Sequence, residues 1–429
     1  MTYQFNSFQP GQSSPSEGVS AAREGPAGGR GPGAARSPDL GPFLGRDAKY
    51  KNIDQKVDRE TGEIMGGTPV FNPMENRVQR FILQSVARKF LPRSRTDNCL
   101  RVRQGGGKQI QVLKSTEYET THYNGLQTCG SVWACPVCSA KIAERRRVEI
   151  QAAMAMHQAA GGCVYLLTLT APHQFEDLLG DLLARQAKAL NRFWSDRAVQ
   201  SVFQEMRTIG QVRALEVTHG RKSPKSNGWH PHYHVLLFAG AGVYLGRVGM
   251  VQMMDWEVRL YLSWSKACKA AGLGEPSPEH GLKLDDGNKA AKYISKWGFE
   301  DEMTKGHTKK ALHGETPFDF LRSYLADSND KQAGGLFKEF AETFKGKRQL
   351  HWSKGLKSRY SIGDKTDDEL AASQDDFARL LGTIALDQWR DVLAADGRGM
   401  VLLLAASGGW SAVELYLASI KRIFSMEVV

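Results

Sequence analysis

The feature that most constrains this chain is a histidine-rich segment, His230-Pro-His-Tyr-His234, which runs directly into the apolar stretch 235–238. The apolar stretch predicts a buried strand, and the side chains of a strand alternate between its two faces. His232 and His234 therefore project from one face, where two imidazoles can hold a divalent cation. His230 precedes a proline at the entrance of the strand, and we place it outside this site.

A glutamate in the preceding strand is the third candidate ligand. Residues 212–218 form another predicted strand, and the polar loop 220–228 joins it to the histidine strand. A hairpin folded symmetrically about Lys225 places residue 216 opposite residue 234, and opposed residues of an antiparallel pair share a face. Glu216 is also unusual in an apolar strand unless it is paired or binds a metal. We therefore predict a metal site formed by Glu216, His232 and His234, although a lone His-X-His pair also occurs as a purely structural feature.

A tyrosine on a later helix is the candidate nucleophile. The segment Lys289-Ala-Ala-Lys-Tyr-Ile-Ser-Lys296 falls in a helix predicted over 287–303. Residues three apart share a helix face, so Tyr293 and Lys296 point the same way. A neutral phenol is a weak nucleophile, and a nearby ammonium group and a metal-polarised phosphate would make it reactive. Taken by itself, the pattern is more typical of a tyrosine at the edge of the core, but its place after the histidine strand favours catalysis.

The order of predicted elements defines a fold class. Between 161 and 305 the order is βαββαβα, with strands at 164–170, 212–218, 230–238 and 281–284. This order predicts an α+β domain in which helices pack on an antiparallel sheet. The expected organisation of the whole chain is a disordered Gly/Pro-rich tail at 1–70, a helix with a Cys-rich module at 71–160, the α+β domain at 161–305, a basic DNA-contacting extension at 306–363 and a helical C-terminal region at 364–429.

Four of the six cysteines lie close together in the sequence: Cys99, Cys129, Cys135 and Cys138. The last two have the C-x-x-C spacing of a zinc knuckle, and the other two complete a tetrahedral four-thiolate Zn²⁺ site, with His122 as the alternative fourth ligand. Four thiolates leave no open position, so this zinc would be structural; the alternative is a group of buried free thiols. Six cysteines are too few for a disulfide scaffold and the N-terminus lacks a secretory signal pattern, so we expect a cytoplasmic protein.

The charge of the chain favours a polyanionic partner. Lys and Arg number 57 against 46 Asp and Glu, which gives a formal charge of +11. Such a chain attracts phosphate backbones, although a basic protein without a nucleic-acid partner can carry the same charge. The longest apolar run, 400–406, is too short to span a membrane, so no membrane association is expected. The predicted DNA contacts are Arg145, Arg146 and Arg147 on the helix after the knuckle, and Lys345, Lys347 and Arg348.

Taken together, these segments resemble the HUH endonuclease superfamily, in particular the Rep initiators of small rolling-circle bacterial plasmids. Tyr165-Leu-Leu-Thr-Leu-Thr170 resembles the first strand of that family, and Gly228-Trp-His-Pro-His-Tyr-His-Val-Leu-Leu237 resembles its metal motif. Ala290-Ala-Lys-Tyr-Ile-Ser-Lys296 resembles its tyrosine motif, here with one tyrosine, and Cys129-Gly-Ser-Val-Trp-Ala-Cys-Pro-Val-Cys138 resembles a cysteine cluster of those proteins. The resemblance runs from about residue 95 to about residue 360.

The resemblance implies a mechanism and partners. Mg²⁺ or Mn²⁺ on His232, His234 and Glu216 would polarise a phosphate of plasmid origin DNA, presented single-stranded or as a hairpin. Tyr293 would attack it and stay on the 5′ end, and the released 3′-OH would prime synthesis. Lys296 would steady either the phosphate or the geometry of the metal site. A host helicase is the implied protein partner, and self-association is left open.

One position departs from the family pattern, and two other functions remain as alternatives. Some initiators of this type carry a glutamate four residues before the tyrosine, which activates water at termination, and here that position is Lys289. Either another carboxylate takes this role, with Asp285 and Asp286 nearby, or termination uses a different group. A transposase or relaxase of the HUH superfamily would use the same chemistry, and a zinc-containing DNA-binding regulator would use none of it.

Overall fold

The computed structural model describes residues 56–57, 64–65, 73–116, 120–222, 228–240, 247–287, 290–291, 314–372 and 378–426. The chain divides into two units, residues 1–70 and residues 71–429. In the first unit, β1 (Lys56–Val57) and β2 (Ile64–Met65) pair in antiparallel fashion. The remainder of the tail predicted at 1–70 lies outside the described residues.

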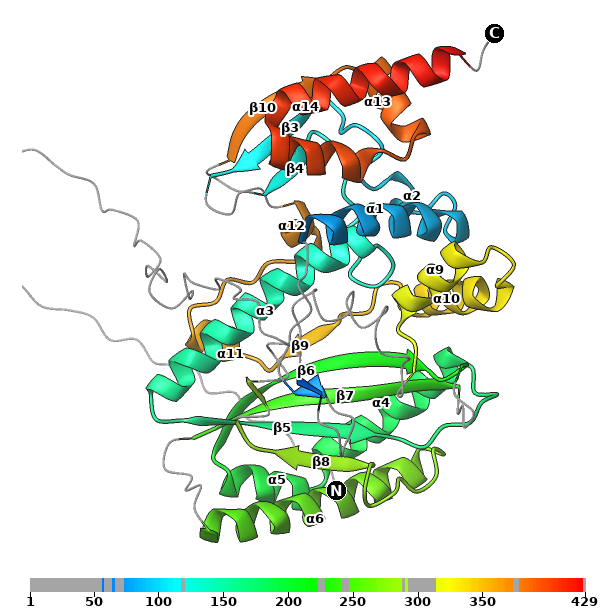
Figure 1. Ribbon diagram of the computed structural model, residues 1–429. Helices are drawn as coiled ribbons and strands as arrows, with labels where there is room; N and C mark the ends of the chain where they lie inside the picture. The colour runs from blue at the N-terminus through cyan, green and yellow to red at the C-terminus, as the bar shows by residue number, and fades with distance from the viewer. Residues whose placement is uncertain are drawn as a thin grey trace, which may run out of the picture. The chain divides into compact units, whose positions relative to one another are not determined.

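The second unit contains a five-stranded antiparallel sheet with the order β8-β5-β7-β6-β9 (Figure 1). Its strands are β5 (Cys163–Thr170), β6 (Thr208–His219), β7 (Trp229–Ala239), β8 (Leu282–Asp285) and β9 (Leu350–Trp352). The four strands predicted between 161 and 305 are all present, and the antiparallel α+β architecture is confirmed. β5 and β7 lie inside the sheet and not at its edges. Both contain a continuous apolar run, which is typical of a strand that is buried on both faces.

Three helices cover one face of this sheet: α4 (Leu179–Ser195), α5 (Arg197–Glu205) and α6 (Arg247–Ala270) (Figure 1). On α6, the residues Trp256, Leu260 and Trp264 recur at every fourth position and are 2%, 0% and 0% exposed. This spacing places them on one helical face. Burying a side chain such as Leu260 stabilises the fold by about 1.5–3 kcal/mol, so this apolar stripe fixes α6 against the sheet.

The opposite face of the sheet is divided into an apolar half and a polar half. The apolar half packs against α3 (Pro136–Ala159) and α11 (Leu356–Arg359), where Val164 and Phe238 meet Ile150. The buried His157 of α3 fastens this packing, since its Nε2 lies 2.7 Å from the Ala239 carbonyl. The polar half lies where β5 ends and β7 begins, and it carries the histidines.

The segment predicted as a basic extension, 306–363, contributes to the main core. It holds α9 (Pro317–Ala326) and α10 (Lys331–Thr343), whose buried phenylalanines join the same apolar cluster as α4 and α6. It also supplies β9, which pairs with β6 and forms an edge of the sheet. β9 was not predicted, because a strand of three residues is too short to show the alternating pattern of a strand.

A second, three-stranded antiparallel sheet has the order β10-β3-β4, with β3 (Ile110–Ser115), β4 (Thr121–Asn124) and β10 (Ala378–Ile384). It packs with α1 (Pro73–Phe90), α13 (Leu386–Ala394) and α14 (Arg398–Met426) around one apolar cluster. Two short helices complete the described chain, α2 (Arg95–Asn98) and α12 (Asp367–Ala372). The region predicted as helical, 364–429, contains α12, α13 and α14, but it also contains β10, whose partner strand lies more than 250 residues earlier in the sequence.

Helix α14 contains a longer apolar segment than the sequence analysis predicts. Its part Arg398–Lys421 is long and apolar enough to cross a membrane by length and composition, whereas the prediction rested on the uninterrupted apolar run 400–406. One such helix is weak evidence for a membrane span. Gly409 interrupts the helix with φ 68° and ψ −162°, and Val401, Ala405 and Val413 are fully buried in the packing around the three-stranded sheet.

Candidate functional site

Strands β6 and β7 bring three candidate metal ligands together. Glu216 lies opposite His232 in the pairing of the two strands, and His234 follows on the same face. One carboxylate oxygen of Glu216 lies 3.4 Å from His232 Nε2 and 3.6 Å from His234 Nε2. Two ligand atoms that each lie about 2.1 Å from one metal are about 3.0–3.4 Å apart, so this group, which we call the His–Glu triad, has nearly the dimensions of a coordination site.

The predicted register of this hairpin was wrong by two residues. A hairpin centred on Lys225 would pair residue 216 with residue 234, whereas residue 234 pairs with Ala214. The polar loop 220–228 is long, and a long loop fixes the register of its strands only loosely. A register shift of two residues leaves every side chain on the same face of the sheet. Glu216 therefore still lies beside both histidines, as predicted.

The second ring nitrogen of each triad histidine is held by the protein. His232 Nδ1 lies 3.3 Å from the His230 carbonyl, which can only accept a hydrogen bond, so Nε2 keeps its lone pair. His234 Nδ1 lies 3.0 Å from Thr168 Oγ1 on β5, and the tautomer with the proton on Nδ1 leaves Nε2 free in the same way. Burial lowers the pKa of His234 to about 4, so this imidazole is neutral near pH 7 and able to bind a cation.

His230 also lies on this face of the sheet, beside His232, although it was predicted to lie outside the site. Its ring centroid lies 5.2 Å from that of His232, and its Nδ1 lies 2.7 Å from Nε2 of His173. Burial lowers the pKa of His230 to about 3, so the pair is joined by a neutral hydrogen bond. The alternation that places His232 and His234 on one face also includes residue 230, and this signal was available in the sequence.

The predicted nucleophile, Tyr293, and its partner Lys296 lie outside the described residues. The chain is described up to Ala291, shortly before them. Ala290 is fully buried in the apolar half of the face that carries the triad, and its N–H donates to the Asp286 carbonyl at 3.1 Å.

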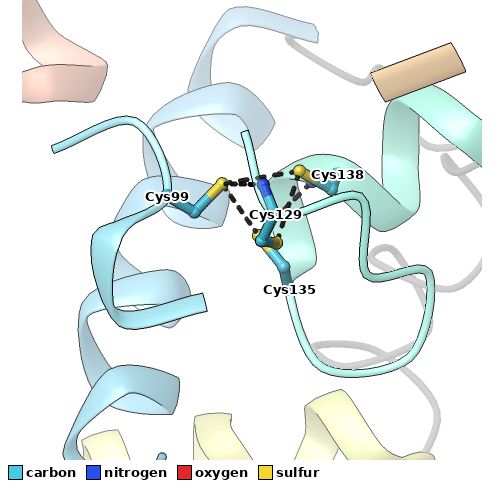
Figure 2. Close-up of side chains that lie close together, drawn as sticks. All are labelled: Cys99, Cys129, Cys135 and Cys138. Carbon is cyan, nitrogen blue, oxygen red and sulfur yellow. Dashed lines mark hydrogen bonds between the residues drawn. The ribbon is translucent and has the colours of Figure 1, made fainter. Parts of the chain in front are cut away.

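The four predicted zinc ligands converge in a buried group, the four-cysteine group (Figure 2). Cys99 follows α2, Cys129 lies in the loop after β4, and Cys135 and Cys138 begin α3. The Sγ atoms of Cys99 and Cys138 are 3.5 Å apart, those of Cys129 and Cys138 are 3.6 Å apart, and those of Cys99 and Cys135 are 3.8 Å apart. Sulfurs on a tetrahedral zinc lie about 3.8 Å apart, so the group could bind such a metal.

The surroundings of the four-cysteine group also fit a cation. Backbone N–H groups point at its sulfurs, as in the 3.4 Å contact from Cys129 N to Cys99 Sγ. Hydrogen bonding with the neighbouring sulfurs, together with burial, raises the pKa of Cys99, which indicates that four thiolates would not be stable here without a compensating cation. His122, the alternative ligand, lies on β4 opposite Leu113 and outside the group.

The residues predicted to contact DNA divide into two sets. Arg146 is bound within the protein, since it forms 2.9 Å ion pairs with Glu149 and Asp367, and Arg147 pairs with Glu144. Arg145 is exposed on α3. The exposed side chains of Lys345, Lys347 and Arg348 occupy the turn between α10 and β9. DNA binding by these residues stays a prediction.

Comparison with known proteins gives the chain its family. A family model described as "Replication protein" matches residues 122–383, which is more than half of the chain and includes the triad. "Protein rep" of Streptomyces lividans is 26% identical over 351 residues, covering 66% of this chain and 75% of that protein. "Neomycin resistance protein" of Streptomyces cyanogenus is 34% identical over 140 residues, covering 27% of this chain and 31% of that protein. No solved structure matches. The chain belongs to the replication protein family.

Proposed function

We propose that this protein is the initiator of plasmid rolling-circle replication, a member of the HUH endonuclease superfamily that nicks one strand of origin DNA and rejoins it. The observation that carries the proposal is the His–Glu triad. Its three ligand atoms converge from two paired strands, and the remaining nitrogens of both histidines are held by Thr168 and by a backbone carbonyl. Membership in the replication protein family supports the same conclusion.

Mg²⁺ or Mn²⁺ bound to the triad would supply Lewis-acid polarisation of the scissile phosphate. Glu216 would contribute a carboxylate ligand to this ion, and His232 and His234 would contribute imidazole nitrogens. The hydrogen bonds to His232 and His234 fix both rings before substrate binds, so little reorganisation is needed.

Tyr293 is the proposed nucleophile. Its phenol oxygen forms a bond to phosphorus, the bond from phosphorus to the 3′ oxygen breaks, and the phenol proton leaves as the 3′ oxygen becomes a hydroxyl. One phosphodiester is replaced by one phosphotyrosyl ester, so the strand can later be rejoined without an energy source. Lys296 would balance the phosphate charge. Ala290, three residues before Tyr293, is buried in the apolar half of the face that carries the triad.

The four-cysteine group is the proposed structural zinc site, and the exposed basic residues are the proposed DNA contacts. A zinc ion on four thiolates has no open position and would hold α2 and the start of α3 together. The exposed set comprises Arg145, Lys345, Lys347 and Arg348. Trp133, between two of the cysteines, donates from Nε1 to the Lys347 carbonyl at 2.7 Å, which links the turn that carries three of these residues to the cysteine loop.

A cleavage assay tests the proposal. Single-stranded origin DNA is incubated with wild-type protein or with Tyr293→Phe, with Mn²⁺ or with EDTA, and the products are separated on a denaturing gel. We expect a covalent protein–DNA band that requires Mn²⁺ and the Tyr293 hydroxyl, while DNA binding survives in the variant. DNA binding by both proteins without a covalent band on any origin strand would favour a non-catalytic DNA-binding regulator. Cleavage only at the ends of a mobile element or at a conjugative origin would favour a transposase or a relaxase.

A further inference from the structure

A buried polar chain connects the four-cysteine group to the C-terminal module, which consists of β10, α13 and α14 (Ala378–Met426). Gln84 of α1 is 1% exposed, and its Nε2 donates to Cys135 Sγ at 3.0 Å. Its Oε1 accepts a hydrogen bond of 2.6 Å from Arg398, the first residue of α14. One side-chain amide therefore bridges a cysteine sulfur and a guanidinium group.

Arg398 is fully buried, and its remaining contacts hold it beside the cysteines. Its guanidinium lies 3.4 Å from the Cys99 carbonyl and donates to Ser85 Oγ at 2.8 Å. Its acidic partner, Asp396, lies 3.4 Å away and is 38% exposed, so solvent weakens the compensation that this carboxylate gives. A buried cation without strong compensation is costly, and a buried anionic centre nearby would offset that cost.

A zinc ion on four thiolates is such a centre, because four negative sulfurs and one divalent cation leave a net charge of about −2. We propose that Gln84 and Arg398 are positioning residues of this zinc site, and that zinc binding and docking of the C-terminal module on α1 stabilise each other. This inference rests on the zinc site proposed above. Gln84 orients and polarises Cys135, while Arg398 balances the charge of the centre and anchors α14. Coupling between two such events is reciprocal by thermodynamic necessity.

The first test measures zinc affinity in the full-length protein, in the presence of a phosphine reductant, by competition with a chromophoric chelator. Gln84→Leu removes both hydrogen bonds at nearly constant volume, and Arg398→Met removes the charge. Outer hydrogen-bond partners of metal ligands typically change affinity by about 10–100-fold, so we expect both variants to release zinc at correspondingly lower chelator concentrations. The matched control is Arg77→Gln. Arg77 also fastens α1, through a 2.6 Å hydrogen bond to the Thr121 carbonyl, but it does not contact the cysteines.

The second test uses only the wild-type chain and is valid even if a variant fails to fold. Zinc is removed with chelator under the same reducing conditions, and amide hydrogen exchange is followed by mass spectrometry. We expect exchange in α14 to rise by about tenfold or more, while exchange in β5 and β7 changes little. Restoring zinc should restore the protection.

The outcomes separate the two proposals. Wild-type zinc affinity in Gln84→Leu and Arg398→Met, or unchanged exchange in α14 after zinc removal, would overturn the coupling and leave the zinc site intact. A wild-type protein that binds no zinc would overturn the zinc site and the coupling together. Neither result bears on nicking by Tyr293, which is measured separately by the covalent band.

Discussion

Acid should destabilise the fold through His219, the last residue of β6. Its ring is buried against Trp229 and Phe320, with centroid distances of 4.8 and 6.0 Å, and its Nδ1 accepts a 3.0 Å hydrogen bond from the Arg221 N–H. Burial lowers the pKa of His219 to about 4, although the nearby Glu315 opposes this shift. In the unfolded chain the pKa is about 6.5.

The direction and size of the effect follow from these two pKa values. Between pH 6.5 and 4, His219 is protonated in the unfolded state but not in the folded state. The free energy of unfolding therefore falls as the pH falls through this window. From about pH 7.5 to about pH 5, the free energy of unfolding should lose about 2 kcal/mol through His219 alone. This is a large share of the roughly 5–15 kcal/mol that stabilises a typical domain.

Urea unfolding of wild type and His219→Asn at both pH values isolates this contribution. Asparagine keeps an acceptor near the position of Nδ1 but does not titrate, so the stability difference between the two proteins should shrink by about 2 kcal/mol at the lower pH. Other buried histidines titrate equally in both proteins and cancel. His280→Asn, at a side chain that is 83% exposed, is the matched control and should follow wild type. If the stability difference between wild type and His219→Asn is the same at both pH values, protonation of His219 does not cause the loss of stability in acid.

Three further predictions concern the triad and two buried polar contacts outside it. Mn²⁺ at about 100 times its dissociation constant should stabilise wild type by about 2.7 kcal/mol in thermal unfolding. If Glu216→Gln binds the ion tenfold more weakly, the same concentration stabilises that variant by about 1.4 kcal/mol. Equal stabilisation of both proteins would exclude Glu216 as a ligand. Tyr360→Phe removes the 2.8 Å hydrogen bond to buried His157 Nδ1 and should cost about 1–3 kcal/mol in urea unfolding, whereas a neutral effect would mean that water replaces the hydroxyl. Arg221→Met leaves Glu315 buried without its 2.7 Å partner and should cost about 3–5 kcal/mol by the same measurement, and a loss below about 1 kcal/mol would show that Lys222, at 2.8 Å, suffices.

Local periodicity determined which side chains share the triad face. The alternation of side chains along a strand is enough to group His232 with His234. Glu216 joins them because the predicted register was wrong by two residues, an even number, which leaves each side chain on the same face. Helical periodicity likewise accounts for the buried stripe of α6, where Trp256 and Trp264 recur at a fixed spacing. The spacing of Cys135 and Cys138 was equally local, and these two residues do start α3 in the buried four-cysteine group.

Tertiary structure decided what lies beyond the reach of any sequence period. The pairing of β10 with β3 joins segments more than 250 residues apart, and nothing in either seven- or six-residue strand specifies the other. The contact between Arg398 and Gln84 also joins distant segments, because an arginine at the start of a helix is ordinary in the sequence and only packing buries it beside the four-cysteine group. Periodicity is a property of each segment, so it can be recognised in the sequence of that segment alone. Contacts between distant segments form only when those segments pack around a shared core, so they are seen only in the folded protein.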